Sequence, residues 1–158
     1  MLLHIMRHGQ ANANSVLARD REQHLTDVGT AQVNTVLNTA KQMGAKLNAI
    51  ACSPLDRAKE TAEIAARIFG LQYSVTNSLE PEGSPDGVYD ELSKLDPVKS
   101  VLLISHQPLV SLLLTDILGT EPKASFATGT LAMVKVDGHP QTGSGTLISL
   151  IPPYLAGN

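Results

Sequence analysis

Short apolar segments alternate along the chain with longer segments in which apolar residues recur every three or four positions. The short segments predict strands, and the longer ones, which begin near Thr, Ser or Pro and end near Gly, predict helices. The expected strands cover 2–6, 50–52, 71–75 and 100–104, and the expected helices cover 27–43, 54–69, 88–95 and 108–118. This alternation indicates a mostly parallel sheet with helices packed on both faces.

Two further strands are expected at 127–136 and 146–151. Turn residues, including Asp137 and Gly138, separate them, so we expect an antiparallel edge. The first strand and the strand at 101–104 suit central positions because they are almost wholly apolar. The predicted fold class is α/β, with three layers, a mostly parallel central sheet, helices on both faces and an antiparallel edge. A length of 158 residues, without an internal repeat or linker, fits one domain over 1–158.

Arginine and histidine residues follow three of the predicted strands. Arg7 and His8 come directly after the first strand. Arg57 lies just past the second, and His106 follows the strand at 100–104 closely. Because the carboxyl ends of parallel strands meet at one edge of a sheet, these side chains should lie together there. An arginine fork binds phosphate oxygens, and a histidine near neutral pH can act as a nucleophile or base.

Two backbone features at the same edge also favour an anion. Gly9 follows His8 and lets the backbone approach a bound group closely. The helices expected to begin at Pro54 and Pro108 would point their amino termini, with unpaired N–H groups, toward this edge. The sequence therefore predicts a site for a phosphoryl group.

Four sequence blocks occur in the order found in the histidine phosphatase superfamily. They are Arg7-His8-Gly9; Leu25-Thr26-Asp27-Val28-Gly29, with Gln32 after it; Ser53-Pro54-Leu55-Asp56-Arg57-Ala58, with Thr61-Ala62; and Ser105-His106. From residue 1 to about residue 118, the chain resembles this superfamily, whose fold is called phosphoglycerate mutase-like. Its short length is similar to that of the small bacterial phosphohistidine phosphatases.

The resemblance implies a phosphatase that needs no metal or other cofactor and works through a phosphohistidine intermediate. His8 would attack phosphorus in line, and water would then hydrolyse the intermediate. Arg7, Arg57 and His106 would hold the three equatorial phosphate oxygens. Asn14 matches an asparagine that follows the first motif in mutase-like relatives and is a candidate phosphate ligand, although an asparagine in a loop also fits a turn former.

Gln107 is a further candidate for phosphate binding, through its backbone amide at the start of a helix. The sequence departs from the wider superfamily where a proton donor is expected. Members that cleave alkyl phosphates use an acidic residue after the third strand, and here Ser78 lies near that position. Glu80 and Glu82 follow and are the candidate general acids, although each also fits a solvated loop charge. A phosphorylated imidazole needs less acid catalysis than an alkoxide leaving group, which offers a reason for a missing acid.

Other function classes fit the sequence less well. In a metal enzyme, His4 and His8 would have to share an ion, but on a strand they stand ~13 Å apart. A P-loop enzyme is excluded because the motif G-x-x-x-x-G-K-[ST] is absent from the sequence. A phosphate-binding module without catalysis has no need for His8. A small-metabolite phosphomonoester phosphatase or mutase of the same superfamily stays open as the alternative, since it would share all the site residues.

Chain length favours a protein substrate over a small metabolite. Relatives that act on small phosphoesters commonly insert helices that form a lid, whereas this chain has little more than the core. The resemblance and the length together imply, as the substrate, a phosphorylated histidine on a phosphotransfer domain or phosphocarrier protein.

The charge and apolar content point away from nucleic acid and membranes. A net charge of −3 gives no basic footprint. No apolar segment approaches the ~20 residues of a membrane span. His4 and Arg7 interrupt the first apolar residues, so no signal peptide is expected, and the expected location of the protein is the cytoplasm. We expect a monomer in which the single cysteine, Cys52, is a buried structural thiol.

Overall fold

A mixed sheet forms the centre of the computed structural model, which describes residues 1–12, 22–95, 98–121 and 125–154. Its strands are β1 (Leu2–Arg7), β2 (Ala49–Cys52), β3 (Ser74–Val75), β4 (Ser100–Ser105), β5 (Leu131–Val136) and β6 (Gly145–Ile151). The helices are α1 (Asp27–Gln42), α2 (Asp56–Phe69), α3 (Pro85–Ser93) and α4 (Leu109–Leu118), with a 3₁₀ helix, η2 (Asn77–Leu79). In this described part of the chain the strand order is β3-β2-β4-β1-β5-β6.

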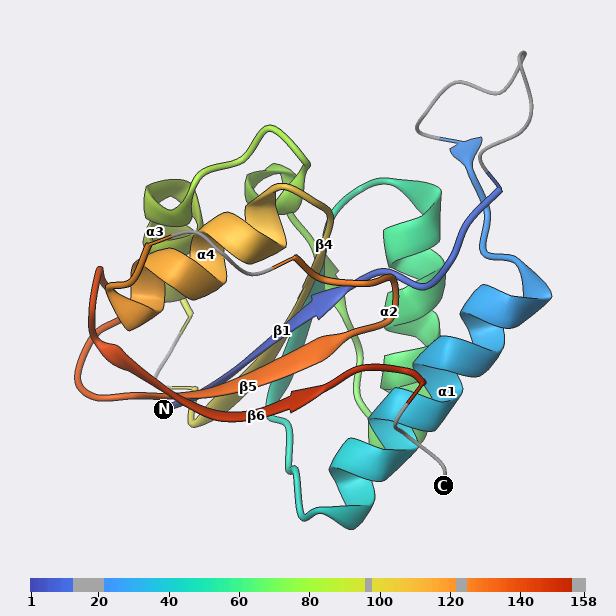
Figure 1. Ribbon diagram of the computed structural model, residues 1–158, viewed down its shortest axis with the longest axis horizontal. Helices are drawn as coiled ribbons and strands as arrows, with labels where there is room; N and C mark the ends of the chain where they lie inside the picture. The colour runs from blue at the N-terminus through green and yellow to red at the C-terminus, as the bar shows by residue number, and fades with distance from the viewer. Residues whose placement is uncertain (13–21, 96–97, 122–124, 155–158) are drawn as a thin grey trace.

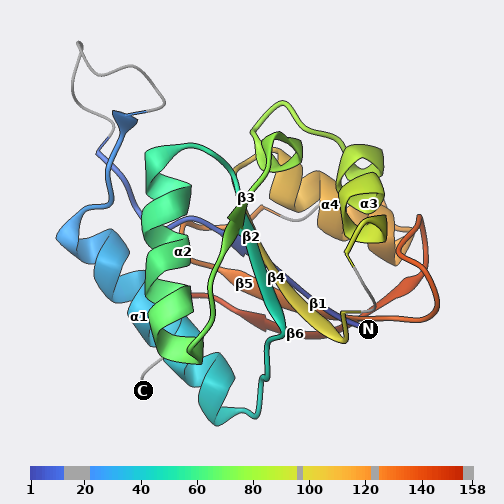
Figure 2. The ribbon, with the colours of Figure 1, turned by 180° about the vertical axis from the view of Figure 1, so that it is seen from behind.

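Helices cover both faces of the sheet. Helices α1 and α2 pack on one face, and α3 and α4 on the other (Figure 1). From behind, β2 and β3 are seen at the opposite edge of the sheet from β6, with α2 beside them (Figure 2). Each face has its own apolar core. The α1/α2 core includes Val33, Ile50 and Ile104, and the α3/α4 core includes Leu3, Leu103 and Leu113.

Strand β1 lies between a parallel and an antiparallel neighbour. It pairs in parallel with β4, with Arg7 opposite Ser105, and antiparallel with β5, with Met6 opposite Leu131. Strand β2 is parallel to β4, and β5 pairs antiparallel with β6. The predicted central positions, the parallel pairing and the antiparallel edge are therefore confirmed. As a result, the carboxyl ends of β1, β2 and β4 lie along one edge of the sheet.

Local sequence signals set the helix ends. The hydroxyl of Thr26 accepts the N–H of Gly29 at 3.0 Å and caps α1, as predicted. Gly70 and Gly119 directly follow the last residues of α2 and α4, and their φ angles are +68° and +64°. Only glycine adopts this left-handed conformation routinely, so these two residues stop the helices where the sequence indicates.

Helix α2 begins two residues later than predicted. The sequence favours Pro54 as its first residue, but the helix starts at Asp56. The hydroxyl of Ser53 accepts the N–H of Leu55 at 3.3 Å, within the turn that precedes the helix. This turn places Arg57 in the first turn of α2.

Two predicted strands are shorter in the structure. The strand expected at 71–75 is reduced to β3, since only Ser74 and Val75 pair with β2. The strand expected from residue 127 begins at Leu131, because the preceding backbone turns to meet the end of β1 instead. In both places the length of the strand depends on which backbone groups find partners in the neighbouring strand.

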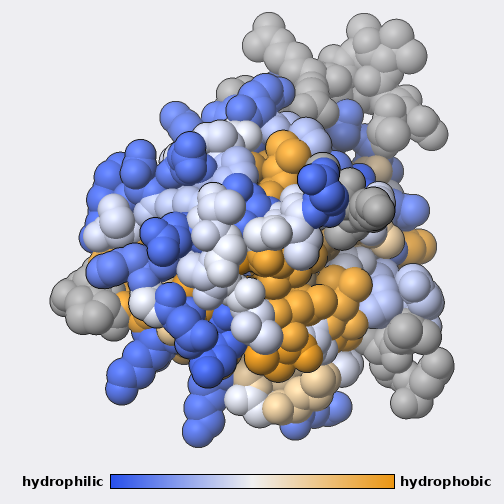
Figure 3. Space-filling model, turned by 60° about the vertical axis from the view of Figure 1, so that its left-hand side comes forward, coloured by the Kyte–Doolittle hydropathy of each residue, from blue (hydrophilic) through white to orange (hydrophobic). Residues whose placement is uncertain are grey.

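Figure 3 shows an apolar patch near and below the centre of a face that is otherwise largely hydrophilic. The edge strand β6 exposes Leu147, Ile148 and Leu150. The register of β5 and β6 shifts between Met133 and Val134, which leaves a β-bulge in this edge. No helix within the described residues is long and apolar enough to cross a membrane.

Candidate active site

The carboxyl ends of β1 and β4 bring two histidines side by side. His8 follows β1 and donates its backbone N–H to the carbonyl of Ser105 at 3.1 Å, and His106 is the next residue after that serine. The two imidazole centroids are 4.9 Å apart, and the ring planes are inclined by 52°. Both residues are buried, His8 being 7 % and His106 2 % exposed.

Hydrogen bonds fix the tautomer of His8. Its Nδ1 lies 2.7 Å from the carbonyl oxygen of Gly9, which can only accept, so Nδ1 carries the proton. Its Nε2 lies 3.2 Å from Nε of Arg57, which can only donate, so Nε2 presents its lone pair. A neutral imidazole in this tautomer can attack an electrophile through Nε2.

Small side chains let α2 come close to the end of β1. Ala58 and Ala62 are fully buried in the α1/α2 core. Thr61, one turn after Arg57, is also fully buried. Its hydroxyl donates to the carbonyl of Arg57 at 2.8 Å and accepts the N–H of Gly9 at 3.3 Å. The helix that carries Arg57 is thus bonded directly to the turn that follows His8.

Helix α1 packs against the same turn through two glycines. A Cβ atom added to Gly9 would come within 2.6 Å of the carbonyl oxygen of Gly29, and one added to Gly29 would overlap the backbone of Gln10. Gln32, further along α1, accepts hydrogen bonds from the N–H of Gln10 and the hydroxyl of Thr128. Its amide therefore joins the turn after β1 to the segment before β5.

The segment before β5 surrounds Arg7. Nη1 of Arg7 donates to the carbonyl of Phe126 at 2.6 Å. The N–H of Gly129 donates to the carbonyls of Arg7 and His8 at 3.1 and 2.9 Å. Burial, followed by the positive charge of Arg57, lowers the pKa of Arg7. The two guanidinium groups are close enough to repel each other, and an anion between them would relieve that repulsion.

His106 presents two buried nitrogens to the site. Within the described residues, neither Nδ1 nor Nε2 of its ring has a hydrogen-bond partner. Burial, with smaller contributions from the charges of His8 and the two arginines, lowers the pKa of His106 from 6.5 to about 2. The ring is therefore neutral at physiological pH. Because unpartnered buried polar atoms are costly, the ring is well suited to receive an anionic oxygen.

The side chain of Gln107 bonds to two serines, whereas the predicted phosphate contact was its backbone amide. Its Oε1 accepts the hydroxyl of Ser111 at 2.8 Å, and its Nε2 donates to the hydroxyl of Ser125 at 3.4 Å. These contacts tie the start of α4 to the segment before β5. The expectation that the Gln107 amide binds phosphate stays a prediction.

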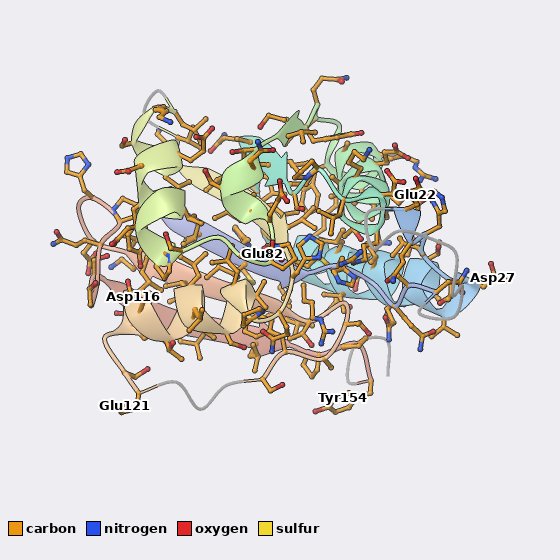
Figure 4. The ribbon with its side chains drawn as sticks, turned by 90° about the horizontal axis from the view of Figure 1, so that it is seen from above. Glu22, Asp27, Glu82, Asp116, Glu121 and Tyr154 are labelled. Atoms are coloured by element: carbon orange, nitrogen blue, oxygen red, sulfur yellow. The ribbon has the colours of Figure 1, made fainter. Side chains whose placement is uncertain are left out.

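The two candidate acids lie on the connection between η2 and α3. Glu80 follows Leu79, whose carbonyl accepts the hydroxyl of Ser105 at 2.7 Å. This bond brings the Glu80 backbone to the carboxyl end of β4. Glu82 is exposed, and it lies near the middle of the molecule in the view of Figure 4. Asn14 lies outside the described residues, so its role, like those of the two glutamates, stays a prediction.

Several groups that frame the site carry no role predicted from the sequence. Phe126 contributes a backbone carbonyl, which leaves no signature in a sequence. The carbonyl of Thr130 accepts the N–H of Arg7 at 3.1 Å, and its buried hydroxyl has no partner within the described residues. A polar residue at the head of an apolar strand was the available signal for Thr130. For Thr61, the available signal was its place in the sequence block that also contains Arg57.

His4 and Cys52 are also buried and titratable, and their contacts indicate a structural and not a catalytic role. His4 Nε2 lies 3.0 Å from the hydroxyl of Ser100, and burial lowers the pKa of His4 from 6.5 to about 4. Cys52 is fully buried, and burial raises the pKa of its thiol to about 12, which agrees with the predicted structural thiol. A search of the described residues finds no group of three or more His, Cys, Asp or Glu side chains able to hold a metal ion.

Fold and site together define the class of protein. The central sheet of an α/β fold places two imidazoles and two guanidinium groups at one edge. The lone pair of His8 Nε2 is directed at Arg57. This set of groups is suited to phosphoryl transfer onto histidine, because it combines a nucleophile with fixed positive charge.

The chain belongs to the histidine phosphatase superfamily. Residues 3–80 match the family model of branch 1 of that superfamily. The chain is 34% identical over 152 residues to the phosphohistidine phosphatase SixA homolog of Haemophilus influenzae, covering 88% of this chain and 90% of that protein. It is 33% identical over 150 residues to phosphohistidine phosphatase SixA of Escherichia coli, covering 92% and 90%.

Solved structures agree with this assignment. The protein histidine phosphatase SixA in complex with tungstate matches with a TM-score of 0.87 and 31% identity, over 98% of both chains. An alpha-ribazole phosphatase from Shigella flexneri matches with a TM-score of 0.75 and 17% identity, over 97% of both chains. The latter similarity shows the fold alone. The predicted phosphoglycerate mutase-like α/β fold is thus confirmed.

Proposed function

We propose that this protein is a metal-independent phosphatase that removes the phosphoryl group from phosphohistidine through a phosphohistidine intermediate on His8. The observation that carries the proposal is the tautomer of His8, whose Nδ1 proton is held by Gly9 while its Nε2 lone pair faces Arg57. Relatives named phosphohistidine phosphatase SixA support the substrate class. The SixA structure with tungstate, a tetrahedral oxyanion, supports a site for phosphate.

In the first step, the Nε2 lone pair of His8 is released from its hydrogen bond with Arg57 Nε, whose N–H turns to a phosphate oxygen, and Nε2 attacks phosphorus in line. The new P–N bond forms as the bond to the substrate imidazole breaks, and the leaving nitrogen takes a proton from water. The phosphorylated His8 ring keeps its Nδ1 proton and is positively charged. The carbonyl of Gly9, 2.7 Å from Nδ1, stabilises this charge.

In the second step, water attacks phosphorus and the bond to Nε2 breaks. Inorganic phosphate leaves, the proton of the attacking water passes to phosphate or solvent, and His8 returns to its neutral tautomer. Arg7 and Arg57 balance the charge on the phosphate oxygens through both steps. This chemistry needs positioned positive charge more than it needs further covalent help.

His106 enters the reaction as a neutral ring. With its pKa lowered to about 2 in the free protein, it carries one N–H that can donate to a phosphate oxygen. A bound phosphoryl dianion would raise that pKa, since an opposite charge favours the protonated form. Either form of the ring donates a hydrogen bond to the anion, so the proposed role does not depend on pH in the neutral range.

The leaving group decides whether Glu80 or Glu82 is needed. A phosphoramidate nitrogen accepts a proton easily, so turnover of phosphohistidine can proceed with water as the donor. An alkyl phosphate would need a positioned acid. The proposal therefore assigns the two glutamates no essential part in phosphohistidine turnover.

The proposed substrate carries its phosphohistidine on a phosphotransfer domain or phosphocarrier protein. The proposal includes action as a monomer in the cytoplasm. The β-bulge at the β5–β6 edge supports the monomer, because a bulge twists an edge strand away from pairing with a second chain. Size-exclusion chromatography and cell fractionation test these two points.

Trapping the intermediate tests the proposed mechanism. Incubation with a labelled phosphohistidine protein, followed by rapid quenching, should leave an acid-labile and base-stable label on His8. The substitution His8→Ala should abolish both the label and turnover. His139→Ala, at an exposed histidine of the β5–β6 hairpin, is the matched control and should retain both.

Two results would contradict the proposal. Undiminished turnover by His8→Ala would rule out the covalent path. Faster turnover of small phosphate esters than of phosphohistidine under the same conditions would instead favour the small-metabolite phosphatase.

A further inference from the structure

A closed ring of hydrogen bonds joins the proposed nucleophile to Arg57. Arg57 Nε donates to His8 Nε2 at 3.2 Å, and His8 Nδ1 donates to the carbonyl of Gly9 at 2.7 Å. The N–H of Gly9 donates to the Thr61 hydroxyl at 3.3 Å, and that hydroxyl donates to the carbonyl of Arg57 at 2.8 Å. Thr61 is therefore the one member of this ring that bonds to the backbone on both sides of the site.

Helix formation does not account for a threonine at this position. Thr61 is fully buried among alanines of α2, and threonine is a poorer helix former than alanine. A hydroxyl bonded to the carbonyl four residues earlier gives a helix no net stability. What the hydroxyl adds is an acceptor for the buried N–H of Gly9.

We propose that Thr61 is a positioning residue for phosphoryl transfer. Its hydroxyl holds the His8–Gly9 peptide at a fixed distance from Arg57 and so keeps His8 in the tautomer that has its lone pair on Nε2. The proposal rests on the function proposed above and extends it to a residue that touches neither the substrate nor the reacting atoms.

The two peptide groups that flank Gly9 have separate attachments. Gln32 holds the peptide that follows Gly9, by accepting the N–H of Gln10 at 2.9 Å. Thr61 holds the peptide that precedes it. The carbonyl of the preceding peptide belongs to His8 and accepts the N–H of Gly129, whereas the Gly9 carbonyl belongs to the peptide that Gln32 holds. Without Thr61 the N–H side of the preceding peptide is no longer held. Because glycine rotates more freely than any other residue, the His8 side can then turn relative to the Gly9 carbonyl and weaken the bond to Nδ1. A ring that turns in this way also leaves its 3.2 Å contact with Arg57 Nε, so the proton can move to Nε2, and that tautomer cannot attack phosphorus.

Thr61→Val tests the proposal because it removes the hydroxyl and keeps the branched shape. Thr61→Ser restores the oxygen. Thr115→Val is the matched control, since Thr115 is a buried threonine of α4 that bonds to the carbonyl of Ser111 four residues earlier at 2.9 Å. Thr61→Ala serves as a second variant without the hydroxyl if valine does not pack.

Two measurements distinguish positioning from simple stability. The first is kcat and KM with a phosphohistidine protein. The second is the ¹⁵N NMR spectrum of the His8 ring in the free protein, which reports the tautomer without any turnover. Because a misplaced reacting group commonly costs up to about 10²-fold in rate, Thr61→Val should lower kcat by about 10- to 100-fold, with KM within about threefold. Its His8 ring should show both tautomers.

The results expected for Thr61→Ser and Thr115→Val show whether the loss of rate comes from the Thr61 hydroxyl. Thr61→Ser should retain kcat within about threefold, and Thr115→Val should match the unsubstituted protein in kcat and tautomer. A folded Thr61→Val protein with the kcat of Thr115→Val and an unchanged His8 tautomer would overturn the proposal. If the unsubstituted protein does not turn over phosphohistidine, the proposed function fails, and the NMR spectra still decide the role of Thr61.

Discussion

Replacing Arg57 by alanine tests the proposed use of positive charge at the site. Arg57 is 7 % exposed, stands in the first turn of α2, and directs Nε at the His8 lone pair from 3.2 Å. Removing one preorganised donor to a charge that develops in the transition state typically costs about 3–4 kcal/mol. At about 1.4 kcal/mol for each factor of ten, kcat/KM should fall by about 10²- to 10³-fold.

Two further variants distinguish the effect of the guanidinium geometry from that of the positive charge and from that of removing any arginine from α2. Arg57→Lys keeps the charge but loses the planar fork and its Nε contact, so it should recover only part of the lost rate. Arg67→Ala removes an exposed arginine from the last turn of the same helix and should leave the rate unchanged. The assay is the initial rate of phosphate release from a phosphohistidine protein. Equal kcat/KM for Arg57→Ala and Arg67→Ala would refute the reasoning.

Three other expectations follow from the same geometry. Glu80→Gln and Glu82→Gln should leave phosphohistidine turnover nearly unchanged; a loss of about 10²- to 10⁴-fold on alkyl phosphates that the unsubstituted protein cleaves well would identify that glutamate as a general acid. Because the pKa of His4 is lowered to about 4, the unfolded chain binds this proton at higher pH than the folded one, so stability is lost as pH falls from about 6.5 toward 4. That loss is about 3 kcal/mol at most, and urea unfolding of His4→Gln should show a shallower dependence on pH over this range. EDTA should leave phosphate release unchanged, and a loss that zinc restores would favour a metal enzyme.

Much of the fold could be predicted because burial imposes a period on the sequence. The apolar runs at β1 and β4 indicated central strands, and both lie in the middle of the sheet. The neighbourhood of His8, Arg57 and His106 was predictable for the same reason, since parallel strands end at one edge.

The sequence was less informative where tertiary contacts set the structure. Strand β3 is short because only two of its residues find partners, and β5 starts late because Gly129 bonds to the end of β1 instead. The contacts of Phe126 and Thr61 with the site use a backbone carbonyl and a helix hydroxyl, whose partners no periodicity reveals. One domain over 1–158 and the roles of the individual site residues stay predictions.

The position of β1 between β4 and β5 also governs when the protein can assemble. His8 and its neighbour His106 are about a hundred residues apart in the sequence, and β1 has no partner until β4 has been made. At a synthesis rate of about 5–20 residues per second, this interval lasts about 5–20 s. During that time the apolar side chains of Leu3 and Ile5 have neither neighbour strand to cover them, which exposes the nascent chain to aggregation. A chain interrupted before His106 would carry the nucleophile without the surroundings that give it a function.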